Sequence, residues 1–156
     1  ANLGDDVYYS GTVGGTREAA FWGIPAGACS LVTRGKPLDF TEAAKHSRRV
    51  CEVLLTTPPA SGVLLNLNVP DGAASEVLGV KITRQGMRGH ASGVSLTKDS
   101  RGRSFYWIAE PFDKWDAADG DDMAAIRAGY VSISPLGKDT TSQADLDPLA
   151  RLLAPK

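Results

Sequence analysis

Residues 40–70 read FTEAAKHSRRVCEVLLTTPPASGVLLNLNVP, and they predict a helix followed by a strand. In the first half, apolar or small side chains recur at three- and four-residue spacing, as on one face of an amphipathic helix: Phe40, Ala43, Ala44, Ser47, Val50, Cys51, Leu54 and Leu55. Asp39 and Glu42 have the spacing of a capping box at the start of this helix. After a turn over 56–62, the alternation from Val63 to Val69 predicts a strand.

The segments before and after this stretch continue the alternation of helices and strands. Residues 10–23 predict a helix that Ser10 or Thr12 caps and Gly23 ends. Further strands are predicted over two segments, 24–32 and 77–83. This order of helices and strands is typical of an α/β protein with a mainly parallel sheet and helices packed against it.

The second half of the chain has a different character. Residues 84–112 are punctuated by glycines and contain a β-prone run at 105–108, so they predict an extended β arm in the form of a hairpin. The arm has too few apolar residues for a core of its own, and we expect it to pack on another part of the protein, such as another subunit. The remaining elements are an acidic loop, a helix to Ala128, a strand over 130–134 ended by Pro135, and a last helix started by Asp147-Pro148.

Length and composition are those of one globular domain. The chain has 156 residues, of which 42% are hydrophobic and 22% charged. Within a single domain we distinguish an α/β core part (1–83), the arm (84–112) and a C-terminal helix-strand-helix segment (113–156). The 17 basic and 18 acidic residues nearly cancel, so no global field attracts nucleic acid or an anionic membrane.

The two cysteines bear on the compartment. Cys29 and Cys51 lie far apart without CxxC spacing, and each falls in an apolar segment. We therefore predict two buried thiols in a reducing compartment, and a cytoplasmic protein. No apolar run approaches the roughly 20 residues that span a bilayer.

The start of the chain contains a candidate anion site. Asn2, Ser10, Gly11 and Thr12 place an amide, two hydroxyls and bare backbone just before a helix N-terminus. Such an end offers unpaired N–H groups and about half a positive charge, which suits phosphate. Plain helix capping is the alternative, and residue chemistry alone favours it.

Other polar residues have simpler interpretations. We expect loop positions for Asp5 and Asp6, and neither histidine, His46 nor His90, has the partners of a catalytic triad. Asn66 and Asn68 share one strand face and are expected to hydrogen-bond to neighbouring loops. The basic cluster consists of Arg84, Arg88, Lys98, Arg101 and Arg103, with Tyr106 and Trp107 nearby. Such a cluster could bind nucleic acid, although the alternation of its residues with Gly, Ser and Asp favours a solvated hairpin.

Several motifs together resemble the SurE family of survival-protein nucleotidases. They occur in the order of that family and cover nearly the whole chain: 2–14, Arg17-Glu18, 23–26, Asn66-Leu67-Asn68-Val69-Pro70, Thr83-Arg84-Gln85-Gly86, Tyr106-Trp107, Asp122 and 129–136. The sequence departs from the family at Gly15-Thr16 and Ala19, which should affect helix packing more than chemistry.

The resemblance implies a Rossmann-like α/β phosphatase that removes phosphate from nucleoside 5′- and 3′-monophosphates, using Mg²⁺ or Mn²⁺. It assigns catalytic roles to Asn2 and Ser10, and binding of the substrate phosphate to Asn2, Ser10, Gly11 and Thr12. It also implies attack by a metal-activated water without a covalent serine intermediate, and a homodimer or homotetramer that exchanges the 84–112 arm.

The resemblance places the metal ligands outside this chain. In the family they are two adjacent aspartates, a serine, and an asparagine that would lie four residues before Asn2, so Asp5 and Asp6 are not the metal pair. Because the chain opens without an initiator Met, we expect an N-terminal segment to be missing. A catalytically inactive fragment, serving in oligomerisation or phosphate binding, is therefore the main alternative to an active enzyme.

Overall fold

The computed structural model describes residues 1–33, 38–87, 94–108 and 117–154. Its centre is a four-stranded sheet with the strand order β1-β2-β6-β3. The strands are β1 (Gly27–Val32), β2 (Val63–Pro70), β3 (Val80–Ile82) and β6 (Val131–Gly137). β1 is parallel to β2 and β3 is parallel to β6, whereas β2 and β6 are antiparallel. The predicted α/β class, with a mainly parallel sheet and flanking helices, is confirmed.

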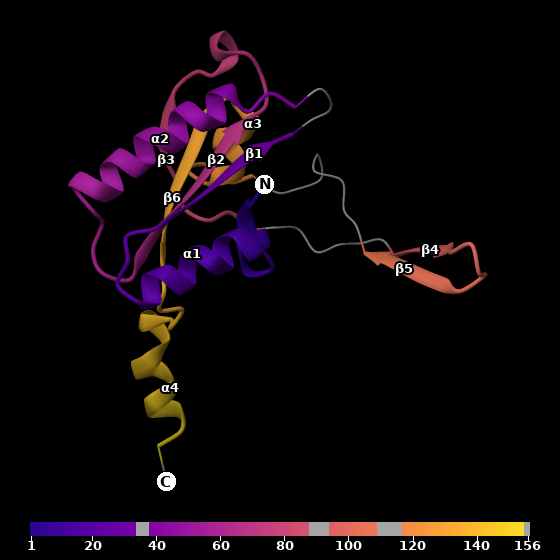
Figure 1. The fold of residues 1–156 in the computed structure, drawn as a ribbon. Coiled ribbons are helices and arrows are strands. Elements are labelled where there is room, and N and C mark those ends of the chain that lie inside the picture. The colour runs from indigo at the N-terminus through magenta and orange to yellow at the C-terminus, as the bar shows by residue number, and fades with distance from the viewer. Residues whose placement is uncertain (34–37, 88–93, 109–116, 155–156) are drawn as a thin grey trace.

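Helices cover both faces of this sheet (Figure 1). They are α1 (Gly11–Phe21), α2 (Thr41–Thr56) and α3 (Asp122–Arg127), and the 3₁₀ turns η1 (Gly4–Tyr8) and η2 (Ala74–Glu76) lie in the connections. α4 (Leu146–Leu152), preceded by η4 (Gln143–Asp145), extends away from the sheet at the C-terminus (Figure 1).

Alternate residues of β2 pack on opposite sides. Leu64 joins α1 in one cluster of buried side chains, while Leu67 and Val69 join Val50 and Leu54 of α2 in another. Since successive strand residues point to opposite faces, α1 and α2 cover opposite faces of the sheet. A third cluster, formed by Leu3, Val32, Met123 and Ile126, joins the N-terminal segment to α3.

The order of the strands places the C-terminal segment inside the sheet. β6 comes from residues 113–156 but lies between β2 and β3, which come from residues 1–83. Val131 and Ser132 are fully buried there. The core is therefore built jointly by both segments.

β6 corrects the prediction that Pro135 ends the strand, because the strand continues to Gly137. Thr83 donates its backbone N–H to the carbonyl of Ile133, so the backbone of Ile133, and by alternation that of Pro135, faces β3. β3 pairs no further than Ile133, and the N–H that proline lacks therefore has no strand to bind.

Two predicted helix starts are also wrong. α2 begins at Thr41 without a capping box, because Asp39 Oδ1 instead accepts from the backbone N–H of Thr41 at 2.8 Å. α4 begins at Leu146, one residue before Asp147, because the preceding turn η4 leads directly into the helix.

The prediction of two buried thiols is wrong. Cys29 is half-buried and Cys51 is exposed. On α2 the buried residues are Ala43, Val50 and Leu54, and Cys51 lies one residue, or about 100° of helix rotation, from Val50. The buried stripe is thus narrower than the apolar pattern of the sequence.

The predicted hairpin is present as β4 (Val94–Lys98) and β5 (Ser104–Ile108), which pair antiparallel. Figure 1 shows the hairpin projecting away from the sheet. Trp107 and Tyr106 are 62% and 70% exposed, so the aromatic residues of the arm do not pack on the described sheet.

Candidate functional site

The N-terminal segment is held on the α1 side of the sheet by buried polar groups. The backbone N–H of Asn2 donates to Asn68 Oδ1 at 2.9 Å, and its carbonyl accepts from Asn66 Nδ2 at 2.7 Å and from Asn68 Nδ2 at 3.0 Å. The side chain of Asn2 donates from Nδ2 to Ser30 Oγ at 2.6 Å. The expectation that Asn66 and Asn68 hydrogen-bond to a neighbouring loop is confirmed.

The start of α1 has the geometry of a capped helix. Ser10 is extended, with φ −81° and ψ 121°, and its Oγ accepts from the backbone N–H of Val13 at 3.1 Å. Its carbonyl accepts from the N–H of Gly14, so helical hydrogen bonding begins at this residue. Gly11 and Thr12 form the first turn and are exposed. Of the two predicted caps, Ser10 and Thr12, the structure shows Ser10, and the predicted end of the helix near Gly23, where φ is +73°, is confirmed.

The predicted site residues therefore fall into two groups. Ser10, Gly11 and Thr12 are contiguous at the N-terminus of α1, whereas Asn2 is 8% exposed and directs its amide nitrogen to Ser30. A short segment that contains η1 connects the two groups.

A cluster of buried hydroxyls lies beside the asparagines and was not predicted. Thr83 Oγ1 is 2.8 Å from Ser132 Oγ and 2.7 Å from Ser134 Oγ. In register, Ser132 lies opposite Asn68 and Ser134 opposite Asn66. The alternation of Ser132 and Ser134 with apolar neighbours was the available signal, because it repeats the pattern of Asn66 and Asn68.

Asp122 is a fully buried acid of this region, next to the buried Asp121, and the sequence indicated Asp122 only as a family landmark. Its Oδ2 accepts from the N–H of Gly4 and its Oδ1 from the N–H of Gly86, both at 2.9 Å. Burial raises the pKa of Asp122, and the hydrogen bonds from Gly4 and Gly86 oppose the rise. Asp122 thus connects the N-terminal segment, the loop after β3 and the start of α3.

The raised pKa of Asp122 predicts that the loss of stability caused by Asp122→Asn depends on pH. A carboxyl group whose pKa is higher in the folded state stabilises the protein fully below its unfolded pKa, about 3.9, and this contribution is lost as the pH rises through the folded pKa. Asparagine does not titrate, so the loss of unfolding free energy caused by Asp122→Asn is expected to be larger near pH 4 than at pH 7. Urea unfolding of both proteins across this range measures it, and an equal difference at all pH values would contradict it.

The two other carboxylates near this segment, Asp5 and Asp6, lie in η1 and not in an irregular loop. Asp5 Oδ1 accepts from Gln85 Nε2 at 3.3 Å, which gives a second connection between the N-terminal segment and the loop after β3. His90 and Arg88 lie outside the described residues.

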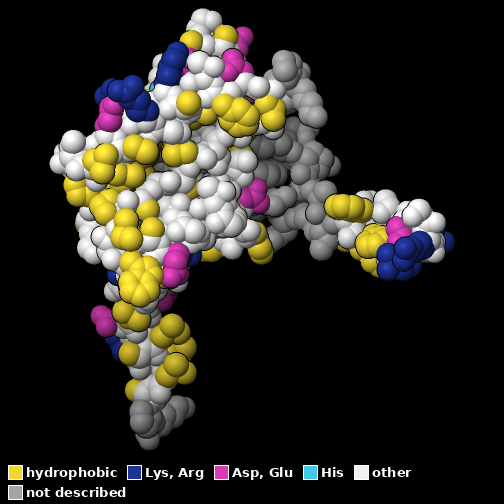
Figure 2. All heavy atoms as spheres, viewed as in Figure 1, with side chains coloured by type: hydrophobic (Ala, Val, Ile, Leu, Met, Phe, Trp, Pro, Cys, Tyr) yellow, Lys and Arg dark blue, Asp and Glu magenta, His cyan; other side chains and the backbone are white. Residues whose placement is uncertain are grey.

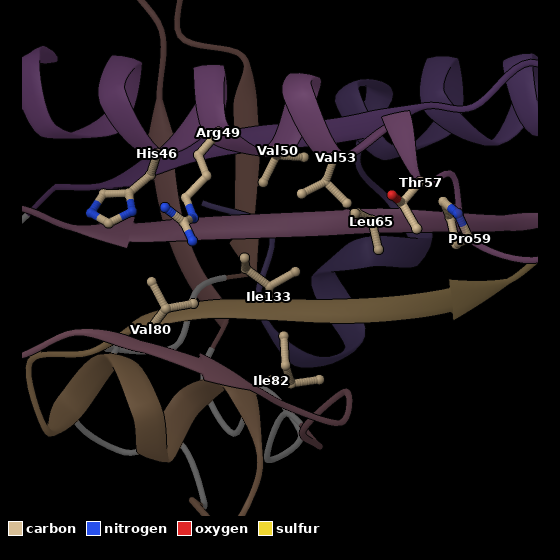
Figure 3. A pocket seen from close by; sticks show the side chains of 10 residues that line it. All are labelled: His46, Arg49, Val50, Val53, Thr57, Pro59, Leu65, Val80, Ile82 and Ile133. Atoms are coloured by element: carbon tan, nitrogen blue, oxygen red, sulfur yellow. The ribbon is translucent and has the colours of Figure 1, made fainter. Parts of the chain in front are cut away.

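A cavity of about 560 Å³ lies between α2 and the sheet (Figure 3). His46 and Arg49 lie at one end of the cavity in the close-up. The rest of the lining is mostly apolar and consists of Val50, Val53, Thr57, Pro59, Leu65, Val80, Ile82 and Ile133. Leu65 and Ile133 alternate with Asn66 and Ser134, so the cavity is on the face opposite the buried polar groups. It brings no convergent set of catalytic side chains together.

Metal ligation has no complete donor set in the described residues. In the parts of the chain that the structure covers, no three His, Cys, Asp or Glu side chains come together as metal ligands would. These residues by themselves do not fit a metal centre.

The basic residues do not form one patch in the described ranges. Arg84 donates to the carbonyl of Asp119 beside α3, whereas Arg101 and Arg103 lie in the hairpin. Arg103 pairs with Asp99 at 2.8 Å, and Figure 2 shows acidic and basic side chains together on the arm.

A helix with the length and apolar character of a membrane span is absent from the part of the chain that the structure describes.

Comparison with known proteins agrees with the motifs. The sequence model of the family "Survival protein SurE" matches residues 1–92. The crystal structure of the SurE protein from Aquifex aeolicus is similar with a TM-score of 0.80 and 35% sequence identity, over 99% of this chain. This chain spans 62% of the length of that protein. Because the family model matches more than half of the chain and the fold agrees over nearly all of it, the chain belongs to the SurE family.

Proposed function

We propose that the protein of which this chain is a part is a phosphomonoesterase that hydrolyses nucleoside 5′- and 3′-monophosphates to nucleoside and phosphate. Membership in the SurE family, a family of phosphatases and nucleotidases, supports this class of reaction. The observation that carries the proposal is the first turn of α1, where the exposed residues Gly11 and Thr12 follow the half-buried cap Ser10 at one helix N-terminus.

Capping and phosphate binding by Ser10 are compatible. A serine hydroxyl has one donor and two acceptor positions, so Oγ can accept from the N–H of Val13 and still donate to a phosphoryl oxygen. The N–H groups of Gly11 and Thr12 are in the first turn, where α-helices leave their donors without intrahelical partners. The positive end of the helix dipole adds to the attraction of an anion.

These donors would act mainly on the transition state. When the bond between phosphorus and the ester oxygen breaks, negative charge is spread over the phosphoryl oxygens. Donors that are already fixed at the end of a helix need not reorganise as this charge develops. Asn2 would contribute through the amide atoms that its bond to Ser30 leaves available, since an amide has two N–H donors and one oxygen acceptor.

We further propose that the reaction depends on Mg²⁺ or Mn²⁺ held by residues outside this chain. The test is a protein extended before Ala1, assayed with nucleoside monophosphates and Mn²⁺, with and without a chelator. We expect phosphate release that the chelator abolishes, and no turnover by the 156-residue chain alone. Metal-dependent turnover by the isolated chain would contradict the placement of the ligands. Failure of the extended protein to hydrolyse any nucleoside monophosphate would contradict the function.

The arm supports a proposal about assembly into homodimers or homotetramers. A two-stranded hairpin is marginal by itself in water, and this one exposes Leu96, Phe105, Tyr106 and Trp107. A second subunit that covers these side chains would remove apolar surface from water.

Phe105→Ser combined with Trp107→Ser is expected to shift the oligomer towards the monomer, because it removes the largest apolar groups of the arm. Light scattering coupled to size-exclusion chromatography measures the mass. Leu55→Ser is the matched control, since Leu55 is 85% exposed on α2 and lies away from the arm. An unchanged mass in the arm variant, or an equal change in the control, would count against assembly through the arm.

A further inference from the structure

The side chains of Asn66 and Asn68 hydrogen-bond to the main chain of Asn2 in the way that the backbone of a neighbouring β-strand would. Asn68 both accepts from the N–H of Asn2 and donates to its carbonyl, and Asn66 donates to the same carbonyl. Asparagine is a short side chain that carries a donor and an acceptor in one plane, as a peptide group does. Both side chains are fully buried, so water does not compete for these bonds.

The proposed phosphate cradle consists of Asn2, Ser10, Gly11 and Thr12. The arrangement described above fixes Asn2 at one end of a short segment, and residues 10–12 of the cradle lie at its other end. After Asn2, Leu3 is buried against Val32 and α3, and Gly4 donates to Asp122. The single turn η1 then leads to Ser10. The position of Ser10 relative to the sheet therefore depends on α1 packing from one side and on the fixed position of Asn2 from the other.

We propose that Asn66 and Asn68 are positioning residues of the phosphate site, which act through the main chain of Asn2 and do not touch the substrate. This inference rests on the proposed function, because it assumes that the phosphate binds at Asn2 and at 10–12. It predicts graded effects, since Asn68 makes two bonds to the main chain of Asn2 and Asn66 makes one.

The two asparagines also differ in how completely they are satisfied. Asn66 Oδ1 is buried without a hydrogen-bond partner within the residues that the structure describes. Asn66→Leu removes this unpaired acceptor together with one useful bond, whereas Asn68→Leu removes only groups that are paired. The stability of Asn66→Leu is therefore expected to be closer to that of the parent chain, which keeps one variant folded for the test.

The experiment measures the affinity of the 156-residue chain for inorganic phosphate by calorimetry, together with amide hydrogen exchange of residues 3–8. We expect Asn68→Leu to weaken orthophosphate binding by about tenfold and Asn66→Leu by less, because small misplacements of binding groups are costly. Exchange over 3–8 should be faster in the same order.

Ser132→Ala is the matched control. Ser132 is fully buried and lies directly opposite Asn68 in register, but it hydrogen-bonds to Thr83 and not to Asn2. It should lower the melting temperature while leaving orthophosphate affinity within about twofold of the parent. Equal losses of affinity in Ser132→Ala and Asn68→Leu, or faster exchange over 3–8 without a loss of affinity, would overturn the positioning role. A parent chain that binds no orthophosphate would instead overturn the cradle of the proposed function, while the exchange data would still show whether the asparagines hold the segment.

Discussion

Ser10→Ala is expected to lower the nucleotidase activity of the extended protein by about 10²-fold, which is the usual effect of removing one preorganised donor to a developing oxyanion. The loss should fall mainly on kcat, because the hydroxyl contributes most when charge develops on the phosphoryl oxygens. The same change removes the acceptor for the N–H of Val13, and its cost in stability is about 1 kcal/mol. Steady-state kinetics with a nucleoside 5′-monophosphate, at a temperature where both proteins are folded, measures the effect.

Two controls separate the cap from the chemistry. Ser10→Thr keeps a hydroxyl at the cap and should recover most of the activity. Asp39→Ala removes the acceptor for the N–H of Thr41 at the start of α2, so it loses a comparable hydrogen bond at another helix start. Equal activity losses in Asp39→Ala and Ser10→Ala would show that Ser10 acts through stability alone. Activity that persists when Asn2→Ala and Ser10→Ala are combined would exclude these residues from the cradle.

Asp122→Ala is expected to have the largest effect on stability, lowering the free energy of unfolding by about 2–6 kcal/mol. The reason is that the buried N–H groups of Gly4 and Gly86 both lose their acceptor, and each unpaired buried donor costs about 1–3 kcal/mol. For a domain whose total stability is about 5–15 kcal/mol, this is a substantial fraction. Chemical denaturation at pH 7 measures the change.

Gly86→Ala tests the same contact from the other side. A Cβ at Gly86 would lie 2.8 Å from Asp122 Oδ1 and 3.0 Å from Met123 Cγ, so the carboxylate or the loop must shift. Gly86→Ala should destabilise the protein. Asp139→Ala should have little effect, because the carboxylate of Asp139 accepts a hydrogen bond from the exposed N–H of Thr141. If Asp122→Ala lowered the free energy of unfolding no more than Asp139→Ala does, the bridging role of Asp122 would be refuted.

The features that were predicted correctly are the helices, the strands and the α1 cap that short-range sequence patterns encode. Residues 40–70 repeat with helix and strand periods, and the structure has a helix and a strand there. The hydroxyl residues before the helical pattern likewise limited the predicted cap to Ser10 or Thr12, and the structure shows Ser10. Asp122 could not be assigned in this way, because its partner Gly4 is 118 residues away.

The errors have physical causes that lie outside the local pattern. Pro135 is tolerated in β6 because β3 stops short of it, and the length of β3 cannot be deduced from the sequence around Pro135. Cys51 belongs to an apolar stripe that is wider than the surface which the sheet offers to α2, so only part of that stripe is buried.

The insertion of β6 between β2 and β3 has a consequence for the order of folding. Asn2 needs side chains 64 and 66 residues later in the chain, and Gly4 needs a carboxylate 118 residues later. Closing such long loops carries an entropy cost that local helices avoid, which slows the formation of distant contacts. During synthesis, the segment 2–10 emerges before the side chains that hold it, and its docking surface is incomplete until Asp122 at the start of α3 has been made. The segment 2–10 is thus among the last parts of this fold to become ordered.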